Sequence, residues 1–211
     1  MIKEREGAVP VKYAKKISAV LLAAACLLCV GCKKNVDEKP DVTLSYENVT
    51  LFECVRLGAY EGLTVTVAAD TDKAIAVWAA VRSNSEILQY PEEAVAYYVA
   101  QAEARCRYYA EEHGVDENEA MVALGTSRAQ MESEARSLVA DDLIVLAVQK
   151  DAGIVLTEDE KARLFDKYAD KYVADFGYDR EYVKENLSDL IYESMLYDKT
   201  AEKLITMNSF K

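Results

Sequence analysis

Residues 127–151 read SRAQMESEARSLVADDLIVLAVQKD, and this stretch decides the fold class. Its apolar positions recur at spacings of three and four residues and return to one face of a helix. They are Met131, Ala135, Leu138, Leu143, Leu146 and Ala147. Ser127 to Gln130 has the form of a capping box, and Gly153 lies just beyond the last apolar turn. The pattern predicts a long helix that runs to about Asp151.

Further helices are predicted on both sides of this one. Each begins at a residue that favours a helix start, and most end at a glycine. The predicted starts and ends are Pro91 to Gly114, Asp116 to Gly125, Thr157 to Gly177, and Asp179 onward through Met195. Residues 91–206 are therefore expected to form a helical domain. The fold class is mainly α, a multi-helix protein with a short N-terminal extended or β segment.

The segment 47–90 has a different pattern. Residues 49–67 favour extended structure, with Gly58 and Gly62 as the only breaks, so two short strands or extended arms are expected there. Residues 74–81 then show a helical pattern that Ser83-Asn84-Ser85 stops. This segment is predicted to contain short strands plus one early arm helix.

The first residues have the anatomy of a signal peptide. Five lysine and arginine residues precede an apolar run of 14 residues, Ile17 to Val30, which is followed by Gly31-Cys32. Such a run spans about 21 Å as a helix, too little for a hydrocarbon core of roughly 30 Å. A cleavable signal over residues 1–31 is the favoured interpretation.

Leu28-Cys29-Val30-Gly31-Cys32 resembles a lipobox, in which the last cysteine receives diacylglycerol. Cys29 stands where leucine is usual, and Cys26 is a rival acceptor. Lys33 and Lys34 suit the start of a polar tether, which favours Cys32. We expect lipid on Cys32, a tether over residues 32–46, and a body anchored through the lipid at the extracytoplasmic face of the cell membrane.

The charge excludes one class of partner. Of 25 basic and 37 acidic residues, five and two lie in residues 1–32, which leaves 20 and 35 and a formal charge of about −15 for the mature part. Nucleic acids need a basic surface, so no nucleic-acid partner is expected.

Two stretches resemble trigger factor, the ribosome-associated chaperone, and in particular its peptide-binding module, shared with SurA-type envelope chaperones. Residues 57–65, LGAYEGLTV, are similar to the family's L-G-x-Y-K-G-L-x-V segment, with Glu61 in place of lysine. Residues 153–160, GIVLTEDE, are similar to its G-I-x-V-T-D-E-E string. Pro91-Glu92 and Gly125-Thr126 fall at matching places, and the resemblance covers most of the body.

The departures from the family limit what the resemblance implies. Only residues 83–90 lie where trigger factor carries its prolyl-isomerase domain, and the basic ribosome-binding tail is missing. The resemblance therefore implies the chaperone module alone, with no ribosome as partner.

Few residues offer catalytic chemistry. The one histidine, His113, falls at a predicted helix end beside two glutamates, where a solvated residue is expected. No motif for zinc, calcium or nucleotide appears, and no cofactor or enzymatic activity is expected. Cys54 and Cys106, the cysteines of the body, fit either a disulfide or two buried thiols.

Tyrosine is the unusual residue, with 14 copies against one tryptophan and four phenylalanines. Its ring gives broad apolar contact with a wettable tip, which suits a surface that meets many chains. Neighbours on a helix diverge by about 100°, so adjacent tyrosines do not both face one core. The candidate client-contact residues are Tyr97, Tyr98, Tyr108, Tyr109, Tyr168 and Tyr172.

These observations lead to an expected function. The chain is interpreted as a membrane-tethered holdase, a non-enzymatic chaperone that binds unfolded or newly exported polypeptides. The alternatives are a prolyl-isomerase-type foldase and an adaptor lipoprotein that holds one fixed partner.

Overall fold

The computed structural model describes residues 44, 46, 48–68 and 71–211. Within these residues it contains eight helices and four strands of two residues each. The helices are α2 (Leu51–Cys54), α3 (Lys73–Asn84), α4 (Glu92–His113), α5 (Glu117–Ala123), α6 (Arg128–Asp151), α7 (Glu158–Phe176), α8 (Arg180–Asn186) and α9 (Ser188–Met207). The strands are β1 (Val55–Arg56), β2 (Thr64–Val65), β3 (Glu86–Ile87) and β4 (Ser209–Phe210). The prediction of a mainly helical fold is confirmed.

Local capping chemistry explains the predicted helix starts. The side chains of Asp116 and Thr157 each accept a hydrogen bond from the backbone N–H three residues later. The carboxylates of Glu119 and Glu160 in turn accept from the backbone N–H of Asp116 and Thr157, which completes two capping boxes. Ser127 accepts from the N–H of Gln130 at 3.3 Å, but no return bond forms in the described residues, so the capping box predicted there is only half made. The starts of α5, α6 and α7 all match the prediction.

Two glycines end helices in the left-handed conformation. Gly114 follows α4 with φ 64° and Gly177 follows α7 with φ 72°. A residue with a Cβ is strained at such angles, so glycine is the usual choice. Both predicted ends are confirmed.

The segment expected to be extended is only partly so. Residues 51–54 form the short helix α2, and β1 and β2 contain two residues each. β1 pairs antiparallel with β3, and β2 pairs parallel with β4 at the far end of the chain. Gly58 lies so close to the end of α3 that a Cβ there would stand 2.0 Å from the Asn84 carbonyl oxygen. Tertiary packing thus limits the strands to short stretches.

The last predicted helix is two helices. The chain leaves helical geometry at Leu187, with φ −118° and ψ 13°, and this residue separates α8 from α9. The change of direction lets Val183 of α8 and Ile191 of α9 both pack in one cluster with Tyr172 of α7. The single helix predicted from Asp179 onward is therefore wrong.

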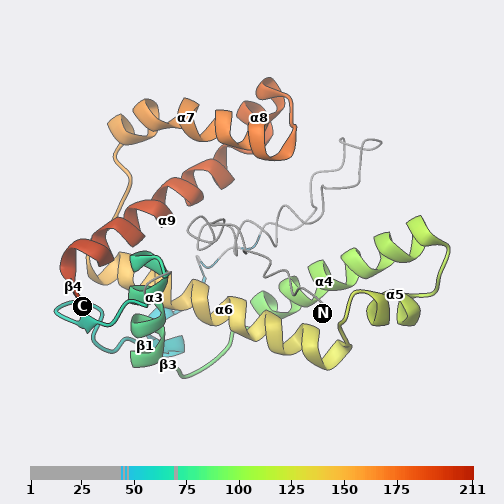
Figure 1. Cartoon of the computed structure of the whole chain (residues 1–211), viewed down its shortest axis with the longest axis horizontal. Coiled ribbons are helices and arrows are strands. Elements are labelled where there is room, and N and C mark those ends of the chain that lie inside the picture. The colour runs from blue at the N-terminus through green and yellow to red at the C-terminus, as the bar shows by residue number, and fades with distance from the viewer. Residues whose placement is uncertain (1–43, 45, 47, 69–70) are drawn as a thin grey trace, which may run out of the picture.

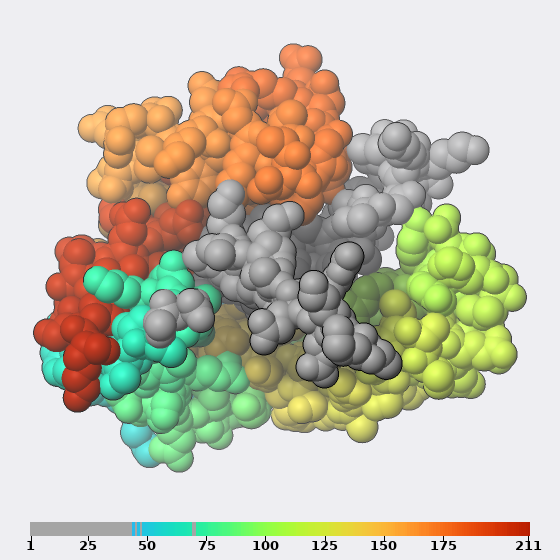
Figure 2. Space-filling model, in the orientation of Figure 1, coloured from blue at the N-terminus to red at the C-terminus, as the bar shows by residue number. Residues whose placement is uncertain are grey.

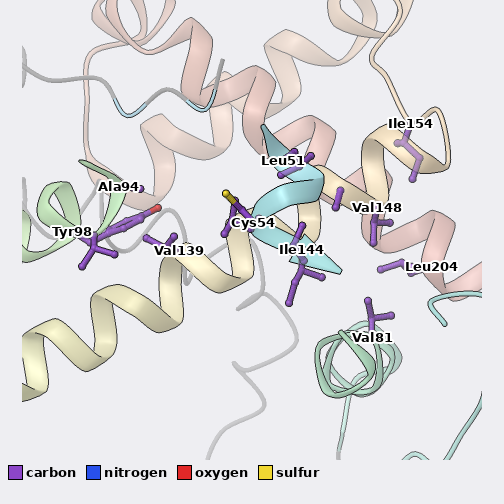
Figure 3. Close-up of a cluster of buried hydrophobic side chains, with 14 of the residues drawn as sticks. Leu51, Cys54, Val81, Ala94, Tyr98, Val139, Ile144, Val148, Ile154 and Leu204 are labelled. Carbon is purple, nitrogen blue, oxygen red and sulfur yellow. The ribbon is translucent and has the colours of Figure 1, made fainter. Parts of the chain in front are cut away.

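A first hydrophobic core joins the two predicted segments 47–90 and 91–206. It combines Leu51 and Val55 with Val81 of α3, and with side chains of α4, α6 and the end of α9. Figure 3 shows Tyr98 and Ala94 of α4 beside Val139 of α6, and Val81 of α3 near Leu204. The two segments therefore share one core.

The first core also includes the end of the predicted tether. Leu44 and Tyr46 are half-buried against it. The tether predicted over residues 32–46 is therefore wrong at these two positions, because their side chains contact the body. Residues 1–43, which contain the predicted signal peptide, Cys26 and Cys32, lie outside the described residues.

A second core is formed by α7, α8 and the first part of α9. Its buried residues are Ala169, Tyr172, Val183, Ile191 and Met195. Polar bonds add to this packing: Tyr168 donates to Asp198 at 2.7 Å, and Lys199 donates to Glu160 at 2.7 Å. α7 and α8 are thus attached to α9.

The two cores place two arms on one base. We call α4, α5 and the first half of α6 the α4–α5 arm, and α7, α8 and the first half of α9 the α7–α8 arm. In Figure 1, α6 and α9 diverge from the end of the molecule that holds α3, and each carries one arm. Figure 2 shows α7 and α8 at the top of the view and the outer part of the α4–α5 arm at its right.

Candidate functional site

The most unusual group of side chains lies where α4, α6 and α9 meet, at the base of the angle between the arms. Asp142 of α6 is only 7% exposed. One of its oxygens, Oδ2, accepts hydrogen bonds from the hydroxyls of Tyr46 and Tyr98, both at 2.7 Å. A buried carboxylate is thereby held by two phenols that lie far apart in sequence.

Burial controls how this carboxylate titrates. Loss of hydration raises the pKa of Asp142 to about 6, although the bonds from Tyr46 and Tyr98 act to lower it. Asp141 and Glu193 raise it further through charge repulsion. Burial, and then Asp142, raise the pKa of both tyrosines in turn. The group is an anion at neutral pH that readily accepts hydrogen bonds.

A second carboxylate stands beside it on α6. Asp141 forms an ion pair with Arg82 of α3, which also donates to the side chain of Ser137 at 3.0 Å. Desolvation raises the pKa of Asp141, and the nearby Arg82 guanidinium opposes the shift. These contacts hold α3 against α6.

Glu193 extends the acidic character to α9. Its side chain keeps contact with solvent, yet reduced hydration raises its pKa, with Asp189 as the second cause. Tyr97 of α4 lies within its electrostatic reach, and the pKa of Tyr97 is raised first by burial and then by Glu193. The base of the angle thus combines acidic groups with tyrosine rings.

Two of the six candidate client-contact tyrosines are buried. Tyr98 is 8% exposed and bonded to Asp142. Tyr172 is 2% exposed, and its hydroxyl lies 3.0 Å from the Ser194 hydroxyl. Both predictions are wrong, because these rings fill the two cores and are almost entirely hidden from solvent.

The other four tyrosines are half-buried and remain candidates. Tyr97 packs edge-on against Tyr98, with ring centroids 5.3 Å apart, so one member of this pair faces the core and the other its edge. Tyr108 and Tyr109 lie near the outer end of α4, and Tyr168 lies on α7. The structure places these residues on both arms.

Sequence reasoning missed several partly exposed aromatic and apolar side chains. A row of rings runs from Phe176 through Tyr178 to Tyr182, with centroids 6.2 and 5.6 Å apart. Val122 on α5 is 79% exposed. The row spans the loop between α7 and α8, where no helical period reveals it.

Sequence reasoning also missed Tyr46 and Asp142. One signal was present, because Asp141-Asp142 interrupts an otherwise apolar stretch of residues 138–148. A carboxylate on the buried side of a helix needs hydrogen-bond partners. Nothing local points to Tyr46, which lies 96 positions away.

Other candidate groups have ordinary surroundings. His113 is the exposed last residue of α4, with its ring 4.2 Å from that of Tyr109. Cys54 and Cys106 are buried free thiols whose pKa values burial raises. Among the described residues, no group of three or more histidine, cysteine, aspartate or glutamate side chains is arranged to hold a metal ion.

Comparisons with protein-family models, curated proteins and solved structures find no match for the chain. Over the described part of the chain, no helix is both long and apolar enough to span a membrane. The resemblance to the trigger-factor module stays a prediction.

Proposed function

We propose that the protein is a membrane-tethered, extracytoplasmic holdase that binds unfolded or newly exported polypeptides. The observation that carries this proposal is the pair of divergent arms, each with partly exposed aromatic or aliphatic side chains. Tyr97 and Tyr109 lie on one arm, and Phe176 and Tyr182 lie on the other. Such an arrangement offers many weak contacts to an extended chain.

The chemistry of these side chains supports weak and unselective binding. Tyrosine gives apolar contact at a low cost in rotamer entropy and keeps its hydroxyl in water. Val122 on α5 and Phe176 at the end of α7 add apolar surface at the two arms. An unfolded chain that bridges the arms would bury apolar area at both ends.

An aggregation assay tests the proposal. The full chain should suppress light scattering by thermally denatured citrate synthase when present in several-fold excess. The double variant Val122→Ser and Phe176→Ser should protect much less well, because it removes exposed apolar surface from both arms. Phe52→Ser is the matched control, since Phe52 is also exposed but lies on α2, away from the arms. Equal loss in the control, or no suppression by the unchanged protein, would contradict the proposal.

Two further measurements separate the alternatives. A prolyl-isomerase should accelerate cis–trans exchange of a proline peptide, whereas a holdase should leave it at the background rate. An adaptor should retain one stoichiometric partner in a pull-down from membranes. A holdase should retain many substoichiometric proteins instead.

The lipid anchor is part of the same proposal. Cys32→Ser should move the protein from the membrane fraction to the soluble fraction and remove the mass of the lipid. Cys26→Ser should leave both unchanged. The reverse result would assign the lipid to Cys26.

A further inference from the structure

The strand β2 has one edge without a partner. In the described part of the chain, β2 pairs only with β4, and the backbone bonds to this neighbour come from Leu63, Val65 and Val67. Successive residues of a strand turn their backbone groups to opposite edges, so those of Thr64 and Thr66 point away from β4. Over residues 44, 46, 48–68 and 71–211, no group bonds to the backbone of these two threonines.

Nothing in the local sequence protects this edge. Thr64 and Thr66 are exposed, and residues 63–68, LTVTVA, contain no charged residue and no proline. A free edge is a template for another strand, and proteins usually guard it with lysine, proline or a covering element. Threonine and valine also favour extended backbone. The edge is therefore open to an added strand.

The strand itself is held firmly in place. Val65 is 6% exposed and packs in the first core. The side chain of Asn208 accepts a hydrogen bond from the N–H of Leu63 at 2.8 Å and donates one to the carbonyl of Tyr60 at 3.0 Å. Because β2 is already ordered, a partner that pairs with it loses only its own conformational freedom.

An extended polypeptide has the chemistry that fits this edge. Its backbone presents donors and acceptors at the spacing of a strand, whatever its sequence. A side chain placed beside Val65 would lie on the buried face of β2, where Val65 is the register partner of Phe210. Side chains beside Thr64 and Thr66 would face solvent. A segment that alternates apolar and polar residues matches both faces.

We propose that the open edge of β2 binds an extended polypeptide segment by strand addition and prefers segments in which apolar and polar residues alternate. The site goes beyond the proposed holdase surface, because β2 belongs to neither arm. Figure 1 shows its neighbour β4 at the end of the molecule opposite α5. The edge offers main-chain bonds, whereas the arms offer side-chain contacts.

Binding of a labelled peptide tests the inference. The probe is the peptide KTVTVTK with fluorescein at its N-terminus, and its anisotropy is recorded during titration with the full chain. A matched probe carries N-methyl groups on its three central residues, which removes the donors needed for pairing. The unchanged protein should bind the first peptide about ten-fold more tightly than the second, because two or more hydrogen bonds are lost.

Amide hydrogen exchange, followed by nuclear magnetic resonance, locates the bound peptide. At saturation, exchange of the Thr64 and Thr66 amides should slow about ten-fold, because both gain an acceptor. The amide of Val67 already donates to the carbonyl of Lys211 and should change little. Protection confined to the two threonines is the expected result.

A proline at the edge should block the site. Thr66→Pro removes an outward N–H that has no acceptor among the described residues, so the pairing of β2 with β4 should remain, and the peptide should bind about ten-fold more weakly. Thr66→Ala keeps the N–H and is the matched control, with an affinity within about two-fold of the unchanged protein. Circular dichroism checks the fold, and the exchange experiment on the unchanged protein stays decisive if Thr66→Pro does not fold.

The outcomes separate this inference from the holdase proposal. Peptide binding without protection of Thr64 and Thr66 would overturn the edge site and leave the holdase proposal in place. Absence of peptide binding, or equal binding of the N-methylated peptide, would overturn it as well. Protection that rises with protein concentration in the absence of peptide would assign the edge to a second copy of the chain instead. The double variant Val122→Ser and Phe176→Ser should bind the peptide like the unchanged protein, since neither residue lies near β2 in the chain.

Discussion

The two arms are stabilised in different ways. The α7–α8 arm has its own core, in which Tyr172, Ile191 and Met195 are buried. Two side-chain hydrogen bonds, from Tyr168 to Asp198 and from Lys199 to Glu160, also join α7 to α9. In the outer part of the α4–α5 arm the buried residues are small, Cys106, Ala110 and Ala120, with Met131 as the one large side chain among them. The α7–α8 arm is therefore a packed unit, whereas the α4–α5 arm depends on the long helices α4 and α6.

The charged residues also differ between the two arms: one arm pairs them in salt bridges, and the end of the other is acidic. On the α7–α8 arm, Arg180 pairs with Asp166 and Asp170, and Lys161 pairs with Glu158. The end of the α4–α5 arm carries carboxylates and no lysine or arginine between residues 108 and 127. From this comparison we expect the α7–α8 arm to unfold as a unit. The α4–α5 arm extends from the first core and should depend on that core for its stability.

The largest effect is expected where both arms depend on one residue. Leu143→Ala empties a fully buried site of the first core and should lower the free energy of unfolding by about 4 kcal/mol. Urea denaturation followed by circular dichroism measures the loss, and hydrogen exchange should accelerate in α4 and α7 alike. Faster exchange in one arm only would contradict the claim that both arms depend on the first core.

A change in the second core should separate the arms. Ile191→Ala should cost about 3 kcal/mol, and faster hydrogen exchange should be confined to α7, α8 and the start of α9. Met131→Ala is the matched change in the α4–α5 arm and should affect α4, α5 and the start of α6. If Ile191→Ala accelerates exchange in α4 to the same degree, the α7–α8 arm is not a separate unit.

Acid should stabilise the junction between the arms through Asp142. Its pKa in the folded protein is about 6, above the ordinary aspartate value of 3.8, so the folded state binds more protons than the unfolded chain as the pH falls through 6. Unfolding should become about 1.5 kcal/mol less favourable between pH 7.5 and 5, and the gain should saturate below the unfolded pKa.

The pH effect is isolated as a difference between the protein and Asp142→Asn, because other groups nearby titrate as well. Those facing Asp142 are Asp141, Glu193, Tyr46, Tyr97, Tyr98 and Tyr197. The variant should have a flatter dependence of stability on pH. If stability depends on pH in the same way in both proteins, the titrating group is not Asp142.

The smallest effect is expected at the helix starts. Thr157→Ala removes the cap of α7 and should cost about 1 kcal/mol. Asp116→Ala removes a similar cap from α5, a seven-residue helix, and should fray that helix with less effect on global stability. Thermal unfolding measures the loss of stability in each variant. A greater loss in Asp116→Ala than in Thr157→Ala would contradict the prediction that the cap of α7 matters more for global stability.

Local chemistry explains which parts of the fold could be predicted. Thr157 caps α7 and Gly177 ends it through bonds within a few residues of each position, so the sequence pattern suffices. The break at Leu187 has no such signal, because it depends on how α8 and α9 pack on α7. The two-residue strands likewise depend on partners far along the chain, such as Ser209 for Thr64.

The candidate site was harder to predict for the same reason. The rotation of about 100° between neighbours on a helix indicates that Tyr97 and Tyr98 face different ways, but it does not say which one faces the core. That choice follows from Asp142, 44 positions away, which accepts the Tyr98 hydroxyl. Tyr46 reaches the same carboxylate from outside any helix, beyond the range of periodicity.

Site-specific photo-crosslinking to an unfolded client tests the central claim most directly. A photoreactive phenylalanine analogue is placed in turn at Tyr97, Tyr109, Tyr182 and, as a control on the base, Arg56, and each protein is irradiated with carboxymethylated α-lactalbumin. The account predicts crosslinks from the three arm positions and few from position 56. Crosslinks of equal yield from all four positions, or from position 56 alone, would contradict it.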